Sequence, residues 1–167
     1  MQAINWQQII EKYGAIVWQT VYRLLGNHAD AADCFQETFI SALELSQRQR
    51  VRNFSTLLAH LATTRAIDRL RQRTRHEQVR LDTSALAAVP SNSPSPAQEV
   101  QMQELAVKLR QALAQLPSNE AEVFCLRYLN DMSYRQIGIE LGIRANLVGV
   151  LLHRVRAKLR NLLEEQK

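Results

Sequence analysis

The chain has 167 residues, of which 46% are hydrophobic and 22% are charged, and its 21 lysines and arginines outnumber 16 aspartates and glutamates to give a net charge of +5. It can bury a modest core, and no apolar run approaches the about 20 residues of a membrane span, so we expect no membrane insertion. The first residues show no signal-peptide pattern, which predicts a cytoplasmic protein, and the basic balance suits a polyanionic partner.

The N-terminal part of the chain predicts two amphipathic helices. Apolar residues repeat at helical spacing and stop before Gly26, which predicts a helix over about residues 5–25 with a glycine end. A second helix is predicted to begin near Asp30. Its acidic residues Asp30, Asp33 and Glu37 lie three and four apart on one face. They either complement the helix dipole and face water or form an acidic docking strip, and Glu37 lies far from the dipole end.

A strongly basic third helix is predicted from about Ser55 to Arg75. Five arginines occupy its last eleven residues, which is more than a favourable charge at a helix C-terminus requires. A second basic cluster, which ends at Arg52, precedes this helix in a predicted loop. Together the two clusters can track a phosphate backbone. Phe54, next to the loop, is either a stacking or wedge residue on nucleic acid or a core anchor at the helix start.

The next segment has the composition of a linker. Residues 82–98 hold three of the four prolines and no helical stripe, so we interpret them as a flexible Pro/Ser-rich connection. It separates a predicted N-terminal helical domain, residues 1–81, from a C-terminal domain, residues 99–167. A flexible coil of this length spans roughly 23 Å, so the two domains can reach separate sites on one partner. Only helical periods occur on either side, which predicts an all-α fold.

The C-terminal domain has the pattern of a four-helix module with a helix-turn-helix. Ser133 and Gln136 form a Ser-x-x-Gln capping box, so a short helix is predicted to begin at Tyr134. Gly142 supplies the sharp turn that follows it. A long basic helix is predicted after Ile143, and its place makes it the candidate recognition helix for the major groove of DNA.

The long helix is predicted to pack one face and to charge the other. Its apolar stripe consists of Val148, Leu152, Val155, Leu159 and Leu162. Basic residues lie off the stripe and can dock on phosphates, and these are His153, Arg154, Arg156, Lys158 and Arg160. The alternative is a solvated helix in an ordinary bundle.

The sequence predicts no enzyme, no metal site and no cofactor. The four histidines are scattered, no carboxylate cluster adjoins them, and no glycine-rich phosphate loop is present. Cys34 and Cys125 lie at apolar helical positions without a Cys-x-x-Cys motif. We therefore expect buried free thiols rather than a disulfide or a zinc site.

Short motifs occur in order along both domains. The first domain contains Asp-x-x-Asp-x-x-Gln-Glu-Thr-Phe over residues 30–39 and Ala-Ile-Asp-x-Leu-Arg over residues 66–71. The second contains Leu116-Pro117, Glu122-Val123-Phe124, Leu126-Arg127-Tyr128, Ser133-Tyr134, Leu141-Gly142-Ile143 and Leu152-His153-Arg154. In this order and spacing the chain resembles, over nearly its whole length, the bacterial extracytoplasmic-function (ECF) sigma factors of the sigma-70 family.

The resemblance implies two partners, core RNA polymerase and promoter DNA. Docking on the polymerase clamp helices would use Asp30, Asp33, Gln36 and Glu37. Capture and melting of the minus-ten element would use Arg52, Phe54, Thr64, Arg65, Asp68, Arg69 and Arg71. The helix-turn-helix would contact the polymerase flap and read the minus-thirty-five element through Tyr134, Arg135, Arg144, Asn146, Leu147, Val150, Leu151 and Arg154. An anti-sigma factor is a further partner that the resemblance allows.

The recognition helix departs from the family pattern near its start. Leu147, Val150 and Leu151 lie off the apolar stripe, where relatives often carry polar residues that read bases. Three interpretations remain open for this patch: contact with thymine methyls together with DNA shape, contact with a protein partner, or packing within the domain.

These features favour a transcription initiation factor that binds core polymerase and selects promoters. The alternative is a helix-turn-helix transcriptional regulator that does not bind core polymerase as a sigma factor. A receiver domain of the kind found in such regulators would alternate strands with helices, whereas this N-terminal half shows only helical periods.

Overall fold

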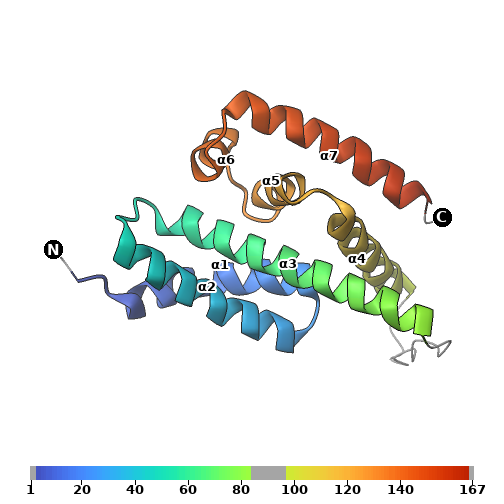
Figure 1. Ribbon diagram of the computed structural model, residues 1–167, viewed down its shortest axis with the longest axis horizontal. Coiled ribbons are helices and arrows are strands. Elements are labelled where there is room, and N and C mark those ends of the chain that lie inside the picture. Colours follow the sequence, from blue (N-terminus) through green and yellow to red (C-terminus); the bar gives the residue numbers. More distant parts are fainter. Residues whose placement is uncertain (1–2, 84–96, 166–167) are drawn as a thin grey trace.

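The computed structural model describes residues 3–83 and 97–165, and within these ranges the regular structure is entirely helical (Figure 1). The helices are α1 (Trp6–Leu25), α2 (His28–Arg48), α3 (Phe54–Thr83), α4 (Ala97–Gln115), α5 (Ser118–Tyr128), α6 (Tyr134–Leu141) and α7 (Ala145–Glu165). The all-α fold and the four helices of the C-terminal module are confirmed. None of the helices in the described ranges has the length and hydropathy needed to cross a membrane.

Asparagine side chains begin the first three helices. Asn5, Asn27 and Asn53 each accept a hydrogen bond from a backbone N–H two or three residues further on, at 2.9 to 3.3 Å. Gly26 ends α1 with a φ of 71°, a left-handed conformation in which glycine has no Cβ to clash. The predicted glycine end of the first helix is confirmed.

The third helix is longer than predicted. We expect it to end near Arg75, but α3 continues to Thr83, and α4 begins at Ala97. The reason is that no glycine or proline occurs between Arg75 and Thr83, so the arginine cluster is not a stop signal. The helices thus enter the predicted linker by two residues at each end, and its remaining residues, 84–96, lie outside the described ranges.

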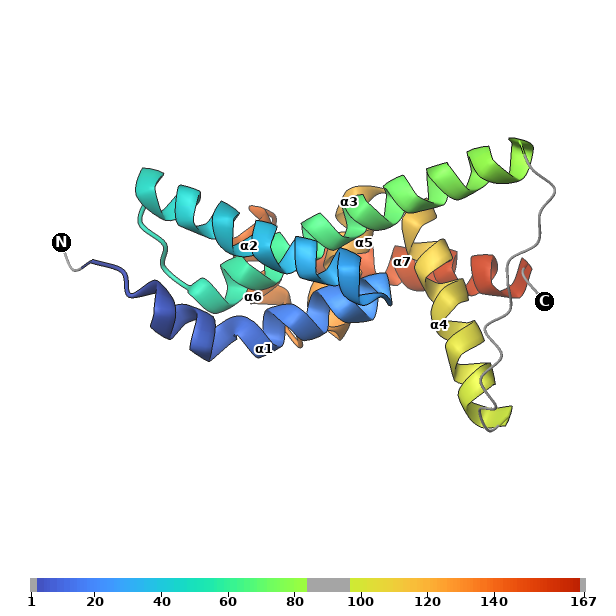
Figure 2. The same cartoon turned by 90° about the horizontal axis from the view of Figure 1, so that it is seen from below.

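Helix α3 lies between two groups of helices (Figure 1). It packs against α1 and α2 on one side and against α4, α5 and α6 on the other. Figure 2 shows the N-terminal half of α4 extending away from the other helices. In agreement, the side chains from Ala97 to Leu105 are exposed.

One cluster of buried apolar side chains draws on both groups of helices. It includes Val21 and Ile67 from α1 and α3, and Leu113 and Val155 from α4 and α7. A second cluster, centred on α5 to α7, includes Ala59 of α3. The two groups therefore pack as one body, and separating them would expose apolar surface to water.

Candidate nucleic-acid interface

Helices α6 and α7 form the predicted helix-turn-helix. Ser133 Oγ accepts a hydrogen bond from the Gln136 N–H at 3.1 Å, and Gln136 Oε1 accepts one from the Ser133 N–H at 2.9 Å, so the capping box is confirmed. Gly142 follows with a φ of 68°. The Ile143 N–H then donates to the Gly138 carbonyl at 2.9 Å. This bond holds the turn against α6 and fixes where α7 begins.

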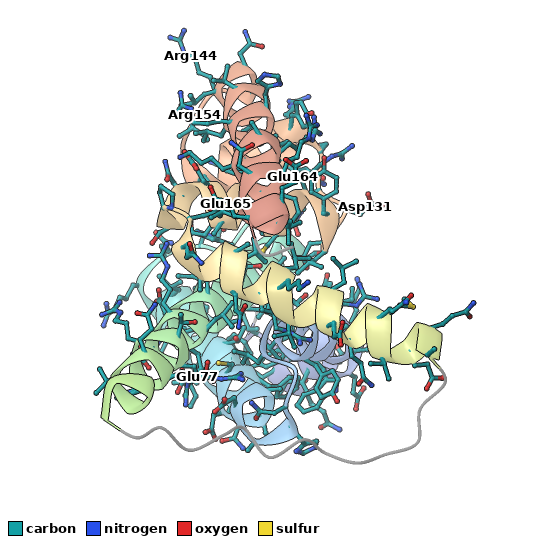
Figure 3. The ribbon with its side chains drawn as sticks, turned by 90° about the vertical axis from the view of Figure 1, so that its right-hand side faces the viewer. Glu77, Asp131, Arg144, Arg154, Glu164 and Glu165 are labelled. Carbon is teal, nitrogen blue, oxygen red and sulfur yellow. The ribbon has the colours of Figure 1, made fainter. Side chains whose placement is uncertain are left out.

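Helix α7 buries one face and exposes the other. The predicted stripe is confirmed, since Val148, Leu152, Val155 and Leu159 are buried and Leu162 is partly buried. The other face is exposed at Asn146, Leu147, Val150, His153 and Arg154. Arg144, which precedes α7, and Tyr134 and Arg135 of α6 are exposed too. Figure 3 shows Arg144 and Arg154 in the upper part of the molecule, away from α1 to α3. A basic face of this kind can dock on phosphates.

Leu151 does not belong to this exposed face. The sequence predicts it as a DNA contact, but its side chain is only 5% exposed and packs in the cluster that contains Val148 and Leu152. Leu151 lies three residues after Val148 and four before Val155, so it falls at the edge of the buried stripe. Packing within the domain therefore explains Leu151. Leu147 and Val150 stay 43% and 51% exposed.

A shallow hollow lies on the exposed side of α7. Its volume is about 420 Å³, and it is lined by Tyr134, Ala145, Asn146, Gly149, Val150 and His153. A Cβ at position 149 would lie 3.4 Å from Tyr134 Cε2, so glycine keeps the space beside the tyrosine ring open. The hollow thus joins candidate contacts on both helices of the helix-turn-helix.

A buried carboxylate beneath α7 holds one of its basic residues. Glu120 of α5 is only 3% exposed, and Lys158 Nζ donates to its two carboxylate oxygens at 2.9 and 2.8 Å. Arg154 Nη1 lies 3.9 Å from the same carboxylate. The sequence predicts Lys158 as a phosphate contact, but here its Nζ bonds to Glu120 of α5 and balances a buried charge. Sequence spacing alone gives no sign of this pair.

The acidic residues of α2 pair with arginines of α3. Arg69 lies 3.3 Å from Glu37, 3.7 Å from Asp30 and 3.9 Å from Asp33, and Arg65 lies 3.9 Å from Glu37. Side chains remain 62% exposed at Asp33 and 42% exposed at Glu37. Such exposed pairs contribute about 0–1 kcal/mol each, so a charged partner can replace them. Asp33, Glu37 and Gln36 of the predicted docking strip therefore stay accessible, whereas the Asp30 side chain is only 26% exposed and also pairs with Arg73 at 3.6 Å.

Two residues predicted to contact the minus-ten element face the second group of helices instead. Thr64 Oγ1 donates to Glu122 Oε1 at 3.3 Å. Arg71 donates to Ser118 Oγ at 2.7 Å and to the Leu116 carbonyl. Arg52, Arg65 and Asp68 are exposed. In this arrangement Thr64 and Arg71 are partly covered by α5 and the turn that precedes it.

A histidine that the sequence analysis did not single out lies in the same contact. His60 Nδ1 is 3.2 Å from Glu140 Oε1 on α6, and His60 Nε2 is 4.0 Å from Glu122 Oε2 on α5. These residues are about 60 and 80 positions apart in the chain. Because periodicity reports only which residues share a helix face, it carries no information on this contact.

Phe54 packs as a core anchor. Its ring is half-buried and lies edge-on to Trp6, with ring centroids 5.7 Å apart at 85°. Of the two interpretations, the contacts support the anchor at the start of α3. One side of the residue also lines an open hollow of about 670 Å³ that includes Arg48, Arg50 and Val51.

Both cysteines are buried free thiols, as predicted. Burial raises the pKa of Cys125 to about 12 and that of Cys34 to about 11, from an ordinary value of 9.0. In the ranges that the structure describes, no group of histidine, cysteine, aspartate and glutamate side chains could hold a metal ion.

Neither cysteine is expected to react with 5,5′-dithiobis(2-nitrobenzoate) at neutral pH while the chain is folded, and both should react in denaturant. The thiols stay protonated and inaccessible in the fold. Because their folded pKa lies above the unfolded value, their contribution to stability is full below about pH 9 and is lost as the pH rises toward the folded pKa. Rapid reaction of Cys125 with this reagent in the native chain would contradict its burial.

Both groups of helices match known family models. Residues 9–76, within α1 to α3, match sigma-70 region 2, and residues 106–159, from α4 to α7, match sigma-70 region 4. These are also the two segments that carry the candidate interface residues.

Curated relatives match across nearly the whole chain. The ECF RNA polymerase sigma factor SigE of Mycolicibacterium smegmatis is 31% identical over 159 residues, which cover 95% of this chain and 62% of SigE. The ECF RNA polymerase sigma factor SigW of Bacillus subtilis is 29% identical over 164 residues, which cover 94% of this chain and 88% of SigW. The chain thus spans less than two thirds of SigE but most of SigW.

Two solved structures share the fold. The sigma factor RpoE in complex with the anti-sigma factor NepR, from Bartonella quintana, gives a TM-score of 0.57 at 17% identity, covering 97% of this chain and 98% of RpoE. CnrH in complex with the cytosolic domain of CnrY gives a TM-score of 0.60 at 21% identity, covering 96% and 88%.

Proposed function

The chain belongs to the ECF sigma factors of the sigma-70 family, and we propose that it is a transcription initiation factor that binds core RNA polymerase and directs it to specific promoters. The observation that carries this proposal is the pair of matches to regions 2 and 4, one on each group of helices. A helix-turn-helix regulator without sigma-factor activity would need only the second. The proposal includes a cytoplasmic location, no catalytic activity of its own and no cofactor.

The exposed acids of α2 are the proposed contact with the polymerase clamp helices. Asp33 and Glu37 lie on the surface, next to Gln36, and their partners are arginines of the same chain. Such weak ion pairs keep the carboxylates oriented without burying them. A basic surface on the polymerase can therefore compete for the carboxylates at small cost.

The loop before α3 and the exposed face of α3 are the proposed contact with the minus-ten element. Arg52 is exposed, and the hollow beside Phe54 holds two further arginines in a space large enough for an unstacked base. Further along α3, Arg65, Asp68 and Arg69 would follow the separated strands. Thr64 and Arg71 would join them once the second group of helices moves off α3.

The helix-turn-helix is the proposed contact with the minus-thirty-five element and the polymerase flap. Exposed side chains of α6 and α7 would meet the major groove: Tyr134, Arg135, Arg144, Asn146, Leu147, Val150 and Arg154. We further propose regulation by an anti-sigma factor, which the RpoE complex with NepR supports by its shared fold.

Reconstitution with core polymerase tests the proposed function. The chain and core enzyme together should start transcription at particular promoters from a genomic template, and neither alone should do so. Mapping the start sites would also recover the promoter sequence. A chain that fails to bind core polymerase would refute the proposal.

Reversing the charge at Asp33 and Glu37 together (D33K/E37K) is expected to weaken core binding by about tenfold or more, because two attractions become repulsions at the proposed clamp contact. Binding of a fluorescently labelled chain to core polymerase would measure the change. The matched control is Glu11→Lys, a charge reversal at an exposed position of α1. Equal affinity of D33K/E37K and the wild-type chain would rule out this contact, provided both show the same helical circular dichroism.

A further inference from the structure

Two exposed apolar residues of α7 are not needed by the core. Val148, Leu151 and Leu152 fill the cluster beneath the helix. Leu147 and Val150 lie outside it with roughly half of their surface in water. Leu147 and Val150 are thus free to contact a partner of the exposed face without loss of core packing.

The hollow beside Val150 is lined by both apolar and polar residues. Ala145, Gly149 and Val150 offer no hydrogen-bonding side chain, whereas Asn146 and His153 do. The absence of a side chain at Gly149 sets the depth of the hollow next to the Tyr134 ring. A small apolar group with polar atoms around it fits this arrangement.

The charges around the hollow indicate that its occupant is DNA. Arg144 precedes it and Arg154 follows it along α7, and both are exposed in the same upper part of the molecule (Figure 3). Two exposed cations beside the hollow favour a polyanionic occupant, and DNA presents phosphates on both sides of the groove that a recognition helix enters.

We propose that this hollow receives the 5-methyl group of a thymine in the minus-thirty-five element, with Val150 as the residue that contacts it. The inference rests on the proposed function and adds which base group the helix recognises. Thymine carries the only methyl group on the major-groove edges of unmodified base pairs. Valine cannot form a side-chain hydrogen bond to a base, so it selects through this methyl group, while Asn146 and His153 can bond to neighbouring base edges.

Deoxyuridine tests the proposal, because it differs from thymidine only by the missing methyl. Each thymidine of the mapped minus-thirty-five element would be replaced in turn by deoxyuridine. Binding of the reconstituted holoenzyme to each promoter duplex would then be measured. One position is expected to lose about threefold to fivefold in affinity, the effect of one buried methyl group. Val150→Ala should weaken binding to the thymine duplex and abolish the difference between thymine and uracil at that position.

Two variants separate the methyl contact from other effects. Val150→Thr keeps the shape of the side chain but replaces one methyl group with a hydroxyl, so it should reduce the preference for thymine. Val100→Ala makes the same change as V150A at an exposed position of α4 and should leave both affinities unchanged.

The outcomes distinguish this inference from the proposed function. Promoter binding that is intact but insensitive to every uracil substitution would overturn the methyl contact and leave the sigma factor assignment standing. A Val150→Ala variant whose DNA binding equals that of the wild-type chain would likewise overturn the methyl contact. A holoenzyme that binds no promoter would instead refute the proposed function.

Discussion

Replacing Gly138 with alanine is expected to destabilise the chain by about 2–3 kcal/mol, because the new Cβ has no room. It would lie 2.6 Å from the carbonyl oxygen of Ile143. That oxygen belongs to backbone that cannot easily move, since the Ile143 N–H donates to the carbonyl of Gly138 itself at 2.9 Å. Relief of the clash would require the turn, and with it the start of α7, to move away from α6.

Thermal and urea unfolding of the full chain would measure this effect. For a chain of this size, a loss of 2–3 kcal/mol corresponds to a fall in Tm of roughly 5–10 °C. Binding to the minus-thirty-five element should fall as well, because α6 and α7 lose their relative orientation. Gly149→Ala is the matched control for stability only, since position 149 lines the proposed DNA-binding hollow: its Cβ would lie 3.4 Å from an exposed tyrosine ring, which can move. A Gly138→Ala chain as stable as the control would show that α6 and the turn are not in close contact.

Replacing Lys158 with methionine is the second change with a large expected effect, a loss of about 2–3 kcal/mol in unfolding free energy. Glu120 would keep its buried charge but lose both of its short hydrogen bonds, leaving only Arg154 at 3.9 Å. Removing one partner of a buried ion pair leaves an uncompensated charge, and this cost exceeds the value of the pair itself. Because Lys158 is 42% exposed, the loss stays below that for a fully buried pair.

A double-mutant cycle isolates this pair. Adding Glu120→Gln to Lys158→Met removes the unbalanced charge with little change of shape, so the double variant should recover most of the lost stability. Arg154→Met serves as the control. It removes a cation near the same carboxylate, but from a longer distance and a more exposed position, and should cost less than about 1 kcal/mol. If Lys158→Met and Arg154→Met lowered stability equally, the buried pair would not carry the effect.

Local features of the helix-turn-helix were predictable from the sequence. Ser133, Gln136 and Gly142 lie within ten residues of one another, and the caps and turn they form depend on nearby backbone groups. The periodicity of α7 also gave the correct buried stripe. Leu151 lies outside the predicted stripe but is buried, because a helix packed against several others buries a wider face than the central stripe.

Contacts between distant segments were not predictable in this way. Nothing in the spacing of Arg69 shows that it pairs with the acids of α2, and nothing around Thr64 shows that it faces α5. Arginines that the sequence predicts as DNA contacts, such as Arg69 and Arg71, therefore pair within the chain here. The composition of residues 82–98 suggested domains free to move apart, whereas burial of apolar side chains brings them together.

The contact of Thr64 and Arg71 with the second group of helices links promoter access to a conformational equilibrium. A ligand that uses either side chain binds only molecules in which α3 and α5 have separated. Its measured Kd is the intrinsic Kd divided by the fraction of such open molecules. A substitution that weakens the contact, such as one at Glu122, then tightens binding at a surface that it does not touch, and selection on promoter affinity can act through residues that never meet DNA.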